Sequence, residues 1–240
     1  MDRCIHTESI VKPRATILLA FAEANSIFSQ TQKEPSPTQK EWRDSLSVLN
    51  RQIMSSEYSS DLYLRKAAVN LELQQWDYAI ETYNDILKRE PSNPAALFYR
   101  GYANGKLRRY ELAANDYRSF LKVAPENVDG MLALAFILIK QGKNKEAMDN
   151  YNRIIEIFPD HSVAFASRAI LEDKEGYLDA ALMDWDKAIE YDSKNIDYIV
   201  SKADLLIRMN RKSDARRMLD EAVRKGAPRG QLQDMFNKTK

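Results

Sequence analysis

The sequence predicts an all-α solenoid of stacked antiparallel helix pairs, because three residue registers recur at intervals of 34 residues. The first register is a run of alanines at Ala79, Ala113, Ala147, Ala181 and Ala215. The second places a large apolar residue four positions later, at Tyr83, Tyr117, Tyr151, Trp185 and Leu219. The third places a small residue twelve positions earlier, at Ala67, Gly101, Ala135, Ala169 and Ala203. Repetition of this length is typical of a solenoid, in which each unit is too small to bury its own apolar face.

The physical reason for these registers is close helix crossing. Two helices approach closely where a small side chain faces another small side chain, and the large residue one turn later fills the space beside it. Pro91, Pro125 and Pro159 follow twelve positions after an alanine, where proline ends the second helix of a pair. Ser193 and Ala227 replace that proline in the last two units, so we expect those helices to run on or to end less sharply.

The five units resemble tetratricopeptide repeats when they are framed as 60–93, 94–127, 128–161, 162–195 and 196–229. The first unit has Tyr63, Ala67, Trp76, Ala79, Tyr83 and Pro91 where that family expects aromatic, small, aromatic, alanine, aromatic and proline. The second unit has Leu97, Gly101, Tyr110, Ala113, Tyr117 and Pro125 at the same positions. The resemblance covers about 170 of the 240 residues and implies a right-handed α-solenoid of five full repeats.

Residues 1–39 are expected to be a signal-like or disordered segment followed by a linker. Lys12 and Arg14 precede the apolar stretch 15–22, and small or polar residues follow, which is the order of a secretory signal. An ordinary amphipathic segment or a misassigned start codon would give the same pattern. The chain is exported or periplasmic under the first interpretation and cytoplasmic under the others. Pro35 and Pro37 indicate the linker.

Each end of the repeat array has a candidate cap. In segment 40–59, Trp42, Ser45, Leu49 and Ile53 fall one repeat before Trp76, Ala79, Tyr83 and Leu87, as in a lone second helix. In segment 230–240, Leu232, Met235 and Phe236 share one helical face. Terminal repeats expose an apolar edge, so both segments are predicted to be capping helices.

Composition argues against several function classes. The net charge is +1, which gives no global field for nucleic acid, although residues 202–240 hold eleven Lys or Arg against five Asp or Glu. A single cysteine, Cys4, and two histidines, His6 and His161, offer no metal site, and His161 is predicted to be a turn residue. No phosphate-binding glycine loop or nucleophile elbow is present. We therefore expect no enzymatic activity, no cofactor and no membrane span.

The resemblance implies that the first helix of each pair lines a concave groove. We predict that the groove binds a partner through Leu64, Phe98, Tyr102, Leu132, Phe136, Ile139, Ile170 and Ile207. Phe98, Tyr102 and Phe136 are the preferred anchors, because aromatic residues dominate interface energetics. Under the alternative, these side chains pack between adjacent first helices. A second possible occupant of the groove is the chain's own segment 17–28.

A basic ladder, defined as Lys106, Lys140, Lys174 and Arg208, occupies position 13 of four units. These cations either meet an acidic peptide or complement the negative end of the helix dipole. A clamp for the C-terminal carboxylate of chaperones, known in some relatives, is not supported, because Leu64, Ala68, Tyr99, Asp129 and Ala133 occupy its positions.

The sequence thus predicts a non-catalytic protein-interaction scaffold that binds a peptide or a partner helix of unknown identity. The alternatives are a structural subunit of a larger assembly and a regulatory module for a separate enzyme. An accessible groove on a monomer favours the scaffold, whereas obligate association favours the structural subunit.

Overall fold

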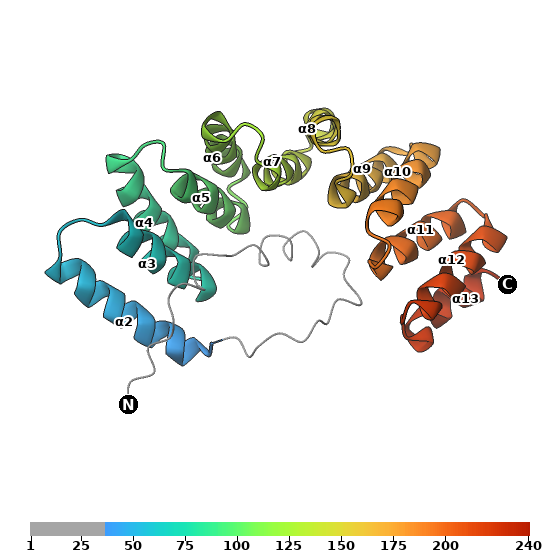
Figure 1. Ribbon diagram of the computed structural model, residues 1–240, viewed down its shortest axis with the longest axis horizontal. Coiled ribbons are helices and arrows are strands. Elements are labelled where there is room, and N and C mark those ends of the chain that lie inside the picture. The colour runs from blue at the N-terminus through green and yellow to red at the C-terminus, as the bar shows by residue number, and fades with distance from the viewer. Residues whose placement is uncertain (1–36) are drawn as a thin grey trace. The chain divides into compact units, whose positions relative to one another are not determined.

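Residues 37–240, the part of the chain that the computed structural model describes, contain helices and no strand, so the all-α prediction is confirmed. These residues divide into two units, 37–143 and 144–240 (Figure 1). The first unit contains α2 (Gln39–Ser55), α3 (Ser60–Glu72), α4 (Trp76–Arg89), α5 (Pro94–Lys106), α6 (Tyr110–Val123) and α7 (Val128–Lys140). The second unit contains α8 (Asn144–Ile157), α9 (Ser162–Glu175), α10 (Leu178–Tyr191), α11 (Ile196–Arg208), α12 (Lys212–Arg224), the 3₁₀ helix η2 (Arg229–Leu232) and α13 (Gln233–Lys238).

Within each unit, every helix packs against its neighbours in sequence. In the first unit α3 pairs with α4 and α5 with α6, and the first helices α3, α5 and α7 also touch one another in turn. In the second unit α9 pairs with α10 and α11 with α12. Figure 1 shows both sets as successive helix pairs joined by short turns. The segment predicted as signal-like lies in residues 1–36, outside the described part of the chain.

The close crossings lie where the sequence registers placed them. All five alanines of the first register have no exposed surface, and their large partners are at most 4% exposed. The small residue opposite them is equally necessary, since a Cβ atom added at Gly101 would lie 3.2 Å from Asp116 Cβ and 3.2 Å from the Tyr117 ring. These contacts are tighter than ordinary van der Waals packing, so the registers mark the points where two helices nearly touch.

The first helix of four pairs begins with a side-chain cap at a repeated position. Asn93, Asn127 and Asn195 accept a backbone N–H bond through Oδ1 at 3.0, 2.9 and 3.1 Å. His161 occupies the same repeat position and accepts from Ala164 N–H through Nδ1 at 3.2 Å. Such caps satisfy donors that have no partner inside the helix. His161, predicted to be a turn residue, is therefore a helix cap.

The turn inside each pair requires a left-handed backbone at one repeat position. The residues with this conformation are Gln74 (φ 57°), Arg108 (φ 58°), Gly142 (φ 75°), Gly176 (φ 85°) and Asn210 (φ 58°). Glycine adopts this conformation without steric cost, whereas the Cβ atoms of Gln74 and Arg108 meet the following carbonyl. The turn geometry is thus fixed by the helix pair, and two of its five occupants are strained by it.

The second helices end at a common place even where proline is missing. We expected α10 and α12 to run on or to end less sharply, because Ser193 and Ala227 replace the proline. Neither helix runs on, since α10 ends at Tyr191, the repeat position at which α4, α6 and α8 end, and α12 ends at Arg224. The Asn195 cap begins α11 only four residues after α10, and this leaves no room for another helical turn.

Two arginine clusters, each centred on a buried aspartate and not foreseen from the sequence, join three helices each. In the first unit Arg100 on α5 donates two hydrogen bonds to Asp116 on α6, at 2.6 and 3.1 Å, and one to Asn84 on α4 at 2.7 Å. In the second unit Arg168 on α9 binds Asp184 on α10 and Asn152 on α8 in the same way. The two sets, here called the arginine clamps, are 68 residues apart, or two repeats.

The ends of the described chain carry short helices that cover the outer pairs. Helix α2 packs against α3 and buries Leu49, and it begins with a capping box in which Thr38 and Glu41 exchange hydrogen bonds. Helix α13 packs against α11 and α12 and buries Phe236, and Leu232 at the end of η2 is buried as well. The proposal that these helices act as caps is consistent with the apolar surface that they cover.

Replacing Ala147 by Leu should destabilise the fold by roughly 1–3 kcal/mol, because the extra methylene groups have no space at a fully buried crossing. Urea unfolding followed by circular dichroism measures this free energy. Asp149→Leu, an exposed position on the same helix, is the control and should change it little. Equal stability of Ala147→Leu and the wild type would show that the crossing register is misassigned.

Replacing Gln74 by Gly should stabilise the fold slightly, by about 0.5 kcal/mol, because relief of the left-handed strain exceeds the added flexibility of the unfolded chain. Gly176→Ala, the matched change in the opposite direction, should destabilise it by about 1 kcal/mol. Nothing lies within 4 Å of a Cβ atom built at Gly176, so backbone conformation alone sets this cost. Thermal unfolding of both variants measures these effects. Melting temperatures that shift in the same direction in both variants would contradict the explanation.

Candidate partner-binding site

A pocket in the first unit gathers aromatic and basic side chains from α5, α6 and α7. The hollow has a volume of about 230 Å³. Tyr102 and Phe136 come from the first helices α5 and α7, and Tyr110 begins α6. Gly105, Ala133 and Ile137 complete its apolar lining. We call this hollow the α5–α7 pocket.

Helices α5 and α7 each present an aromatic residue and a lysine to the pocket. Lys106 Nζ lies 5.3 Å from the centre of the Tyr102 ring, and Lys140 Nζ lies 5.0 Å from the centre of the Phe136 ring. The members of each pair are four residues apart, so they stack on one helix face. Each aromatic ring holds a cation at the rim of the pocket while part of the ring remains accessible to solvent.

The charge lining the pocket has one sign. Among residues 37–240, Lys106, Arg108 and Lys140 line it, whereas no Asp or Glu does. Arg108 Nε donates to the Tyr110 hydroxyl at 3.4 Å, which places the guanidinium beside an aromatic wall. Within residues 37–240, no carboxylate forms an ion pair with these three cations. The pocket therefore combines apolar walls with uncompensated positive charge.

Two predicted groove residues are buried instead of accessible. Phe98 is 7% exposed and its ring makes edge contacts with Tyr99, Tyr117 and Phe120, at centroid distances of 5.3, 5.5 and 5.1 Å. Leu132 is 4% exposed. Position 5 of the first helix thus faces its own helix pair. The prediction that Phe98 is an exposed anchor is wrong, whereas Tyr102 and Phe136 are accessible in part.

The other predicted groove residues are spread over both units. Leu64 and Ile139, on α3 and α7, are half-buried in the first unit. Ile170 is 45% exposed on α9, and Ile207 is half-buried on α11. None of the four lines the α5–α7 pocket. Their role in partner binding remains a proposal.

The members of the basic ladder differ in their surroundings. All four lie in the last turn of a first helix, where the helix dipole favours a cation. Lys106 and Lys140 line the pocket, and Lys174 is exposed at the end of α9. Arg208 binds Asp173 at 2.8 and 2.5 Å and Asp204 at 3.0 Å, which raises the pKa of Arg208 and neutralises its charge locally. Arg208 is therefore engaged within its own unit.

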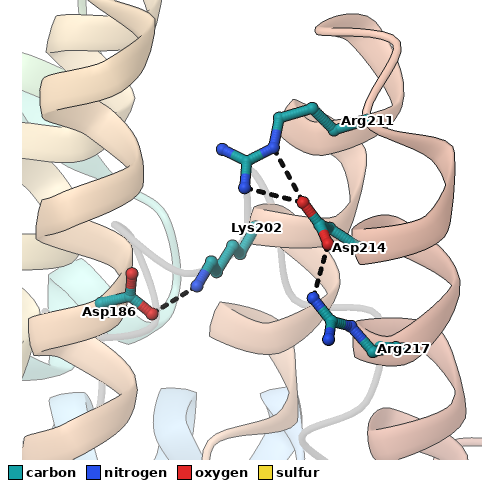
Figure 2. Close-up of polar contacts among 5 residues, drawn as sticks. All are labelled: Asp186, Lys202, Arg211, Asp214 and Arg217. Carbon is teal, nitrogen blue, oxygen red and sulfur yellow. Dashed lines mark hydrogen bonds and ion pairs between the residues drawn. The ribbon is translucent and has the colours of Figure 1, made fainter.

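The second unit contains a larger hollow, of about 630 Å³, between α10, α11 and α12. Five of its charged side chains pair with one another, as Figure 2 shows. Asp186 accepts from Lys202, and Asp214 accepts from Arg211 at 2.7 Å and from Arg217 at 2.5 Å. Hydrogen bonds, first from Arg211 and then from Arg217, lower the pKa of Asp214. This surface offers less uncompensated charge to a ligand than the α5–α7 pocket.

Sequence reasoning missed two contributors to the pocket, Tyr110 and Arg108. Tyr110 matches an aromatic position of the repeat pattern, and Arg108 lies in the turn between two helices. Their proximity to Tyr102 depends on the bend of that turn, which has no signature in a helical pattern. Three positively charged residues within four positions, Lys106, Arg108 and Arg109, were the available signal.

The described residues offer neither a metal site nor a membrane span. No group of three or more His, Cys, Asp or Glu side chains in residues 37–240 is placed to hold a metal ion. Over the same residues, no helix combines the length and apolar character needed to cross a bilayer.

Solved structures with a similar fold are repeat proteins. A tetratricopeptide repeat protein from Parabacteroides merdae ATCC 43184 superposes with a TM-score of 0.60 at 20% identity, covering 84% of this chain and 78% of that one. MamA from Desulfovibrio magneticus RS-1 gives a TM-score of 0.62 at 18% identity, with 69% and 94% coverage. YrrB, described as a tetratricopeptide repeat protein with an unusual peptide-binding site, gives 0.58 at 20% identity, with 75% and 93% coverage. At these identities the likeness shows the fold alone.

The sequence comparison agrees with the structure. No curated protein matches the chain. The family model described as "Tetratricopeptide repeat" matches residues 64–111 and 104–162. These ranges contain the first three alanines of the register, the Asn93 and Asn127 caps and the helices from α4 to α8, so this part of the chain matches the tetratricopeptide repeat family.

Proposed function

We propose that this protein is a non-catalytic interaction scaffold whose α5–α7 pocket binds a peptide or partner helix with an apolar side chain flanked by carboxylates. The apolar side chain enters between Tyr102 and Phe136, and the carboxylates meet Lys106, Arg108 and Lys140. The observation that carries the proposal is the lining of the pocket, to which the described part of the chain contributes aromatic walls, three cations and no acidic residue.

The energetics favour a ligand of this kind. Accessible aromatic rings gain desolvation energy when an apolar side chain covers them, and such residues contribute most to binding at interfaces. The cations set orientation and speed up encounter with an acidic partner. No carboxylate of the pocket has to be displaced, so a ligand would form these ion pairs without breaking existing ones. The printed description of YrrB, which names a peptide-binding site on a similar fold, supports a peptide as the ligand.

Replacing Tyr102 and Phe136 together by Ser should abolish capture of the partner from native cell extract, because the apolar walls of the pocket are lost. The circular dichroism spectrum should persist, since both side chains are only half-buried. Tyr78→Ser is the matched control, because Tyr78 is 63% exposed and does not line the pocket. Capture that survives in the double variant would refute the proposed site.

The chain's own segment 17–28 is the competing occupant. If this segment fills the pocket, deleting residues 1–30 should strengthen capture, and the double Ser variant should no longer respond to the deletion. If an external partner alone fills it, the deletion should leave capture unchanged.

Reversing the charge of the pocket should change ligand preference. The probes are two fluorescent peptides, one with a central Phe flanked by Glu residues and one flanked by Lys residues. Lys106→Glu combined with Lys140→Glu should weaken binding of the acidic probe by about tenfold or more, or ~1.4 kcal/mol, and favour the basic one. Fluorescence anisotropy at two salt concentrations measures both affinities.

The control for charge reversal is Lys40→Glu combined with Lys122→Glu. Both lysines are exposed in the same unit and lie outside the pocket, and the change in net charge is identical. Equal weakening in the two double variants would mean that overall charge, not the pocket, selects the peptide.

A further inference from the structure

The two arginine clamps differ at one position, and this difference changes the chemistry of the second clamp. In the first clamp, Asn104 Nδ2 donates a hydrogen bond to Asp116 Oδ2 at 3.1 Å. The equivalent residue of the second clamp, 68 positions later, is Glu172. An amide that donates to the aspartate is thus replaced by a carboxyl group, which can donate only when it is protonated.

The second clamp therefore holds two carboxyl groups beside one arginine. Arg168 directs Nε and Nη2 to Asp184 at 2.6 and 2.8 Å and Nη1 to Asn152 at 2.7 Å. The nearest approach of Arg168 to Glu172 is 4.0 Å. Because the donors of the guanidinium are directed elsewhere, the buried Oε2 atom of Glu172 has no hydrogen-bond partner while the carboxyl is ionised.

Burial makes this arrangement sensitive to protons. The side chains of Glu172 and Asp184 are 13% and 8% exposed. The charged groups that face Glu172 are Asp184 on α10 and Arg168 on its own helix, while α8 contributes the uncharged Asn152 to the clamp. Desolvation, followed by the charge of Asp184, raises the pKa of Glu172 to about 7, and Arg168 opposes this shift.

We propose that Glu172 is a proton-controlled latch between α9 and α10. Protonated Glu172 donates a hydrogen bond to Asp184, as Asn104 does to Asp116, and completes the clamp. Ionised Glu172 repels Asp184 across a buried contact and weakens the packing of α8, α9 and α10. The clamp of the first unit, which has Asn104 in this place, lacks that sensitivity.

The direction of the pH effect follows from linkage. The pKa of Glu172 is higher in the folded chain than in the unfolded chain, so the folded state binds the proton more tightly. The stabilisation that protonated Glu172 provides is complete below the ordinary pKa range of glutamate. It is lost as the pH rises through about 7.

The test uses the full chain and two measurements. Carbon-detected NMR titration of the Glu172 carboxyl should give a midpoint near 7, and a midpoint in the ordinary glutamate range would overturn the proposal. Thermal unfolding between pH 5.5 and 8.5 should show that Glu172→Gln, which mimics the protonated acid, melts at least about 2 °C above the wild type at pH 8.5 and near it at pH 5.5. Parallel melting curves for the two proteins over this range would also overturn the latch, because every other titrating group is shared.

Asn104→Glu supplies the reciprocal variant, since it installs the acid in the first clamp. The melting temperature of this variant should fall more than that of the wild type as the pH rises, because both clamps then contain an ionised glutamate. If the melting temperature of this variant fell between pH 5.5 and pH 8.5 by no more than that of the wild type, the comparison between the two clamps would be contradicted. The titration of unmodified Glu172 decides the proposal even if this variant does not fold.

Discussion

The helix pairs depend on how closely their two helices approach at the crossing of small residues. Alanine at the first register and alanine or glycine at the third leave no room for another methyl group, as the contacts around Gly101 show. The crossing fixes which side of each first helix remains open. In α5 and α7 that side carries an aromatic residue and, one turn later, a lysine. The pocket is therefore a consequence of the same steric constraint that forms the repeat.

The arginine clamps add specificity to this apolar packing. Each clamp joins the second helix of one pair to both helices of the next, and its directional hydrogen bonds tolerate little sliding. Buried ion pairs are weak evidence for net stability, because desolvation offsets much of the attraction. Between the clamped repeats, Leu134 occupies the arginine position and is buried, so an apolar contact serves the same place. The alternation indicates that the polar clamp selects register while the apolar residues supply most of the stabilisation.

The sequence was sufficient for the helices and for the core, because steric registers at Ala79 and its equivalents repeat at a fixed interval. The sequence was insufficient to predict the burial of Phe98, since a helical period does not distinguish a face turned to the groove from one turned to the partner helix. Arg208 shows a different limit, because its partner Asp173 lies 35 residues away and only the packing of α9 on α11 brings the two together. Tyr102 and Phe136 were predicted to line the groove because the resemblance implies that the first helices face it, and they share an environment because they share a repeat position.

The variable residues on the open side of the first helices explain how one fold can carry a local binding preference. The aromatic and lysine pair of α5 and α7 is absent from α3, which has Ala68 and Glu72 at the corresponding positions. A ligand that extends from the pocket toward α3 would leave the aromatic walls and meet a carboxylate instead of an ammonium group. Like charges in such an arrangement disfavour a wrong register, and opposite charges favour the right one. Within the first unit, the contrast between Glu72 and Lys106 therefore limits an acidic ligand to α5 and α7, while the crossing residues beneath both helices stay the same.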